Sequence, residues 1–133
     1  MARLEHHLSL VLFGVSCGSG TAEMTCADGP QLEDYSSFVP RRAALHCDIL
    51  MDCDPSGFQA TFVGRDEEKL NKCLAEYSRR YAKQGTERVC EQGCEFLTDA
   101  GDTCLEQAET VSCNDWDSGA LQQTCGEDLW ACD

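Results

Sequence analysis

The number of cysteines constrains the fold of this chain more than any other feature of its sequence. Eleven cysteines occur in 133 residues, and ten of them fall within residues 18–133, where they make up about 9 % of the chain. That density in a short chain is typical of secreted domains held together by disulfides. The disulfide candidates are Cys26, Cys47, Cys53, Cys73, Cys90, Cys94, Cys104, Cys113, Cys125 and Cys132. The sequence alone leaves their pairing open.

The spacing of these cysteines argues against redox and zinc motifs. No C-x-x-C pair occurs, so the sequence offers neither a thioredoxin-type dithiol nor a zinc knuckle. Cys94 and Cys104 have nine residues between them, as in the twin C-x9-C helical hairpins of the mitochondrial intermembrane space, but that fold needs a second such pair. Structural disulfides are therefore the favoured interpretation.

Residues 1–16 are predicted to be a signal peptide. Residues 8–15 form an apolar run of eight, which suits the h-region of an export signal and is too short to span a membrane. Small residues on either side of Val15 favour cleavage just before Cys17. The run Val15-Ser16-Cys17 resembles a bacterial lipobox, which predicts lipidation of Cys17 and a membrane anchor. The alternative is a plain secretory signal cut at the same bond.

The same region also matches the G-x-S-x-G nucleophile elbow of serine hydrolases. That motif requires a strand before the turn and an acid and a histidine later in a large sheet. Only 13 residues precede Gly14, and His46 is the one histidine that follows. We therefore expect no catalytic residue here.

The rest of the sequence predicts a tether followed by helices. Residues 17–35 are rich in Gly, Ser and acids without an apolar period, so we expect a flexible tether, followed by a Cys-rich helical domain over residues 36–133. Apolar residues recur at helical spacing in four segments: one that opens around Pro40 and ends at 54–57, one from Asp66 to Gly85, and those at 87–97 and 102–111. Short turns or one last helix complete the chain. The predicted fold is an all-α, disulfide-stapled bundle of about four short helices.

Several segments of the sequence resemble a family of Cys-rich lipoproteins of uncharacterised function from myxobacteria and related delta-proteobacteria. The similar segments are RRAALHCDILMDCDPSGF, KCLAEY and CLEQAETVSCNDWDSGALQQTCGEDLWAC. The shared pattern is Cys47-x5-Cys53-Asp54-Pro55 with Phe58, Cys73-Leu74, Cys104-Leu105 with Ala108, Ser112-Cys113, Leu121, Cys125 and Cys132. The resemblance covers residues 41–133 and implies an exported helical domain. It transfers no catalytic residue.

Negative charge is concentrated in the last third of the chain. Residues 87–133 hold twelve acids and one base, Arg88, within a total net charge of −14. This charge disfavours nucleic acid as a partner. The spacing of Glu87, Glu91 and Glu95 predicts an acidic ridge on the helix expected there. Such a ridge either keeps an exported protein soluble or binds a partner with a basic surface or Ca²⁺.

A calcium loop has one local candidate. Asp52-x-Asp54-x-Ser56-Gly57 matches the first six positions of an EF-hand loop, but Val63 occupies the position of the essential bidentate Glu. A helix end with a Pro-Gly turn is the better interpretation. We expect no metal site and no cofactor.

The function predicted from the sequence is that of an exported, lipid-anchored structural or protein-binding module. It would lie in the cell envelope, at the outer membrane, with the membrane as one partner through its N-terminal lipid; otherwise it would be periplasmic or secreted. The alternative is a secreted soluble protein that binds a ligand or Ca²⁺ through the acidic C-terminal half. We do not expect an enzyme.

Overall fold

The computed structural model describes Cys26 and residues 32–133. The elements are α1 (Leu32–Cys53), α2 (Pro55–Thr61), α3 (Asp66–Thr86), the π-helix η1 (Glu87–Glu91), β1 (Glu95–Phe96), α4 (Thr98–Thr110), α5 (Cys113–Asp117), α6 (Leu121–Thr124), the 3₁₀ turn η2 (Glu127–Leu129) and β2 (Trp130–Ala131). The predicted all-α, disulfide-stapled fold is confirmed. The predicted signal peptide, residues 1–16, and the lipidation site Cys17 lie outside the described residues.

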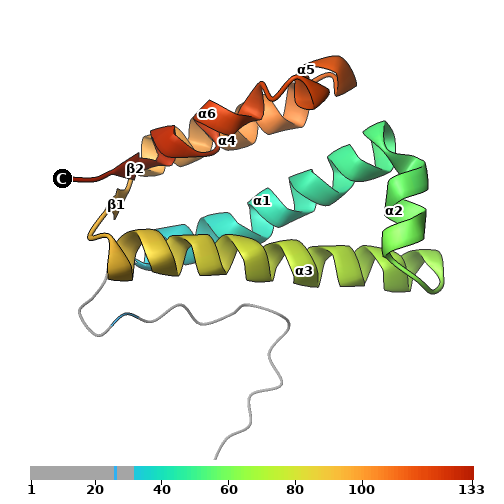
Figure 1. Cartoon of the computed structure of the whole chain (residues 1–133), viewed down its shortest axis with the longest axis horizontal. Helices are drawn as coiled ribbons and strands as arrows, with labels where there is room; N and C mark the ends of the chain where they lie inside the picture. The colour runs from blue at the N-terminus through green and yellow to red at the C-terminus, as the bar shows by residue number, and fades with distance from the viewer. Residues whose placement is uncertain (1–25, 27–31) are drawn as a thin grey trace, which may run out of the picture.

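Helix α1 is the central element of the bundle. It contacts α3 on one side and α4 on another, and α2 crosses the end of the α1–α3 pair (Figure 1). Helices α1 and α3 run antiparallel. The described part of the chain contains no helix long and apolar enough to cross a membrane.

The start of α1 differs from the sequence prediction. The helix begins at Leu32, before the predicted end of the tether at residue 35, and Pro40 lies inside it. Leu32 and Tyr35 are buried, so they extend the apolar stripe of the helix by one turn toward the N-terminus. Pro40 is exposed, and packing on the opposite face holds the helix together despite the missing N–H of the proline. The helical domain therefore begins at residue 32 instead of 36.

Local capping explains the junction between α1 and α2. The Asp54 carboxylate accepts a hydrogen bond from the Gly57 backbone N at 3.1 Å, and Pro55 occupies the first turn of α2. These are standard helix-starting interactions. The 52–57 segment is thus a helix junction, as its Pro-Gly composition indicated.

Helix α3 begins at Asp66 as predicted but continues past Gly85. Gly85 is buried, and a Cβ at this position would overlap the ring of Tyr35. The glycine therefore allows α1 and α3 to approach closely instead of ending the helix.

The predicted third helix, at 87–97, is wrong. Residues 87–91 continue α3 as a π-helix, Gly93 reverses the chain with φ of +68°, and Glu95 begins β1. This strand pairs antiparallel with β2 through Glu95↔Ala131 and Phe96↔Trp130.

Five disulfides pair all ten cysteines in the described part of the chain. They join Cys26–Cys90, Cys47–Cys73, Cys53–Cys113, Cys94–Cys132 and Cys104–Cys125. The second links α1 to α3, the third links α1 to α5, and the last two hold the C-terminal segment against β1 and α4. Four of these cysteines, including both members of Cys47–Cys73, are almost fully buried. The sulfurs therefore form part of the core.

The remaining core is small and is divided among three clusters along α1. One is mainly aromatic, with Tyr35 packed against Phe38, Phe96 and Trp130 at ring-centroid distances of 4.9 to 5.6 Å. The second surrounds Cys47, Phe58, Phe62 and Cys73, and the third contains Ile49, Ala108 and Leu121. Because α1 contributes to every cluster, it connects the α3 side of the bundle to the C-terminal side.

Candidate binding site

A stack of arginine and aromatic side chains joins α1 to α3. Arg42 and His46 are one turn apart on α1, and Tyr77 and Tyr81 are one turn apart on α3, so each pair shares a face. The Arg42 guanidinium lies 5.1 Å from the centroid of the Tyr81 ring. The His46 ring stacks on Tyr77 at 3.8 Å, and His46 Nδ1 is 2.7 Å from Tyr81 Oη. The Arg80 guanidinium lies 5.1 Å from the centroid of the Tyr77 ring.

Arg42 is the unusual member of this stack. Arg42 is only 6 % exposed, and neither its Nε nor its Nη1 has a hydrogen-bond partner. The ion pairs found among the described residues involve other arginines: Arg65, Arg79, Arg80 and Arg88. A cation–π contact of this kind is worth about 0.5–2 kcal/mol, but it leaves the N–H groups of Arg42 unsatisfied.

Burial and positive charge determine the protonation of the neighbouring groups. Burial, followed by the charges of Arg42 and Arg80, lowers the pKa of His46 to about 4. Burial raises the pKa of Tyr81, so at neutral pH its hydroxyl keeps its proton and His46 is uncharged. The positive charges that act on His46 and Tyr81 at neutral pH are those of Arg42 and Arg80, and Arg80 is paired with Glu76 at 2.8 Å.

A hollow of about 360 Å³ opens beside the stack, and we call it the Arg42 cleft. Arg42, His46 and Tyr81 form its wall from α1 and α3, and Trp116, Leu121 and Gln122 close it from the C-terminal segment. A second hollow of about 410 Å³ lies next to it and shares Tyr81, Gln84, Cys125 and Gly126. The two hollows therefore meet along the line where α3 faces the C-terminal segment.

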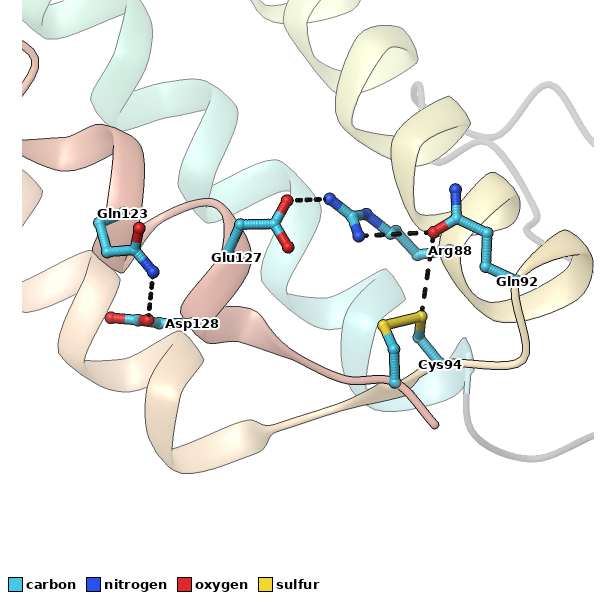
Figure 2. A network of polar contacts seen from close by, with 7 residues as sticks. Arg88, Gln92, Cys94, Gln123, Glu127 and Asp128 are labelled. Atoms are coloured by element: carbon cyan, nitrogen blue, oxygen red, sulfur yellow. Dashed lines mark hydrogen bonds and ion pairs between the residues drawn. A yellow bond between two sulfur atoms is a disulfide. The ribbon is translucent and has the colours of Figure 1, made fainter.

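An ion pair fixes the far wall of the second hollow. Arg88, in η1, pairs with Glu127, in η2, and its Nη1 donates to Gln92 Oε1 at 3.4 Å (Figure 2). The Gln92 oxygen also lies 4.0 Å from the Cys94 sulfur, which is in a disulfide and has no proton to donate. Unlike Arg42, Arg88 has a carboxylate that balances its charge.

The structure pairs the ten cysteines but changes the interpretation of the acidic ridge and of the 52–57 segment. The predicted acidic ridge does not form on one helix, because Glu87 and Glu91 lie in η1 whereas Glu95 lies in β1. A π turn and a chain reversal break the four-residue helical period. In the 52–57 segment, Asp54 caps a helix, and the described residues contain no cluster of three or more His, Cys, Asp or Glu side chains suited to a metal.

The sequence does not predict the Arg42 cleft, although it does place Arg42 at an unusual position. Tyr35, Val39, Arg42 and His46 follow the three- and four-residue spacing of a buried helix face. A charged residue on such a stripe is unusual, since arginines are almost never fully buried without a partner. The chain matches no known family model, no curated protein and no solved structure.

Proposed function

We propose that this protein is an exported, lipid-anchored module of the cell envelope that acts by binding. The observation that carries this proposal is the complete pairing of the ten cysteines in the described residues. Disulfides in such number indicate an oxidising, extracytoplasmic compartment. Because each of the ten has a partner, none is left for Cys17, and lipidation gives that eleventh cysteine a role.

The chemistry of the described residues favours binding over catalysis. Cysteines in structural disulfides provide no thiolate nucleophile. His46 is the one histidine among the described residues. Its ring stacks on Tyr77, and its Nδ1 hydrogen-bonds the Tyr81 hydroxyl. An uncharged ring that is held by two tyrosines suits a structural or binding role. The resemblance to Cys-rich lipoproteins supports the same proposal.

Two partners follow from this role. The bilayer holds the N-terminus through the lipid on Cys17, with each buried methylene contributing about 0.8 kcal/mol. A protein with a basic surface is the partner that matches the acidic C-terminal residues. Nucleic acid is disfavoured by the same charge.

Intact mass spectrometry of the full-length chain, expressed in a Gram-negative host, tests this proposal. We expect membrane-extracted protein to begin at Cys17, to carry a diacylglyceryl and an acyl group, and to react with no thiol reagent after denaturation. The matched control is Cys17→Ser, which should move the protein from the membrane fraction into the soluble fraction with its disulfides intact.

Two results would count against the proposal in different ways. An unmodified chain that begins at residue 17 would remove the anchor and support simple secretion. A cytosolic chain that begins at Met1 and has ten or more reactive thiols would overturn export itself.

A further inference from the structure

Arg42 presents a charge that the described structure does not balance. Buried arginines are normally paired with a carboxylate or bound to an anion, because an unpaired buried charge is strongly destabilising. Here Arg42 is 6 % exposed and has two nitrogens without partners. The chain has 24 acidic residues, yet no ion pair in the described residues joins any of them to Arg42. The centroid of the Tyr81 ring lies 5.1 Å from the Arg42 guanidinium carbon, and the ring accepts no conventional hydrogen bond from its N–H groups.

Arg42 also lines a space that can hold a molecule. Arg42 lines the Arg42 cleft, whose volume of about 360 Å³ falls in the lower part of the range for small-ligand pockets. Trp116 and Leu121 from the C-terminal segment also line the cleft, together with Gln84 and Gln122. The cleft thus combines one cation with an apolar wall and a few neutral hydrogen-bonding groups.

We propose that the Arg42 cleft binds one small organic carboxylate. The carboxylate group is held by the Arg42 guanidinium, and the apolar body of the ligand lies against Trp116 and Leu121. This inference rests on the proposed binding role of the protein. It does not depend on export or on lipidation of Cys17.

The charge of the cleft favours a monoanion. Among the described residues that line it, Arg42 is the one charged side chain, since His46 is neutral at pH 7. A carboxylate matches a single guanidinium in charge and in planar shape. A phosphate dianion would leave one negative charge unbalanced inside a strongly acidic protein. An organic cation would meet Arg42 directly and be repelled.

Isothermal titration calorimetry on the full-length oxidised chain at pH 7 tests the inference. The probes are benzoate and phenylacetate, with benzamide as the neutral analogue of benzoate and inorganic phosphate as the alternative anion. We expect one saturable site for the carboxylates, with a Kd between roughly 10 µM and 1 mM. Benzamide and phosphate should bind at least tenfold more weakly.

Two arginine variants separate a specific site from a general effect of charge. Arg42→Met removes the cation while keeping an apolar side chain, and it should weaken benzoate binding at least tenfold. Arg41→Met is the matched control, because Arg41 is the neighbouring, exposed arginine on α1 and its loss changes the net charge equally. It should leave the Kd within twofold of the original value.

Several outcomes would overturn the inference. One is the absence of saturable binding of either carboxylate to a chain that is folded by circular dichroism. Equal affinity for benzoate and benzamide, or unchanged affinity in Arg42→Met, would also refute a carboxylate site at Arg42. None of these results bears on the mass and thiol measurements described above, so the two proposals can fail separately.

Discussion

Lowering the pH from 7 to 5 should destabilise the fold through His46. This ring has a pKa of about 4 in the folded protein and about 6.5 in an unfolded chain. Well above pH 6.5 the ring is neutral in both states and has no effect on stability. Between pH 6.5 and 4 the unfolded chain binds a proton that the folded chain does not bind, so the free energy of unfolding falls as the pH falls.

The size of this effect follows from the two pKa values. Between pH 7 and pH 5 the difference in proton binding is worth at most about 2 kcal/mol of unfolding free energy. About 1 kcal/mol remains after allowance for solvent screening, because the ring is only partly buried. The neighbouring charges, Arg42 and Arg80, are both positive and oppose protonation.

Urea denaturation of the oxidised protein at pH 7 and pH 5 measures this loss, and His46→Gln is the comparison. Glutamine can still hydrogen-bond the Tyr81 hydroxyl but does not titrate, and carboxylates contribute equally to both proteins. We expect the original chain to lose about 1 kcal/mol more than the variant. In NMR spectra, the His46 ring proton, assigned by its absence from the variant, should titrate near pH 4. Equal losses in the two proteins, or a midpoint near 6.5, would refute the packing of His46 between Tyr77 and Tyr81.

Three further predictions concern stability and can be measured by denaturant unfolding of the oxidised protein. Gly85→Ala should destabilise the protein by about 2 kcal/mol or more, because overlap with the buried Tyr35 ring outweighs a helix-propensity gain of about 1 kcal/mol. An increase in stability would contradict the close approach of α1 and α3. Replacing both Cys47 and Cys73 by Ala removes a cross-link across 26 residues and should cost about 3–4 kcal/mol. Pro40→Ala should stabilise the protein by about 1–3 kcal/mol, since this exposed proline lies inside a helix. A loss of stability would argue against a continuous α1.

The stapled helical architecture was predictable because its signals are local or compositional. The density of cysteines indicated disulfides before any pairing was known. The start of α3 follows from Asp66 and the acids after it, which favour a helix N-terminus, and the apolar period around Leu105 predicted α4. These features depend on a few neighbouring residues, so they can be identified without knowledge of the fold.

The features that the sequence did not predict depend on distant residues. Gly85 suggested a helix end because the ring of Tyr35, fifty residues earlier in the chain, could not be foreseen. The spacing of Glu87, Glu91 and Glu95 indicates a helix, because the strand that pairs with Glu95 lies at the C-terminus, far from it in the sequence. The Arg42 cleft requires α1, α3 and the C-terminal segment together, so Arg42 on the buried stripe of α1 does not by itself indicate the other residues that line it.

The order of the disulfides along the chain has a consequence for resistance to proteases in an extracytoplasmic compartment. Three of the covalent loops overlap in sequence, so every peptide bond between residues 26 and 132 lies inside at least one of them. These loops are closed by Cys26–Cys90, Cys53–Cys113 and Cys94–Cys132. A protease that cuts this region once therefore releases no fragment, and the severed pieces remain joined until the bridges are reduced.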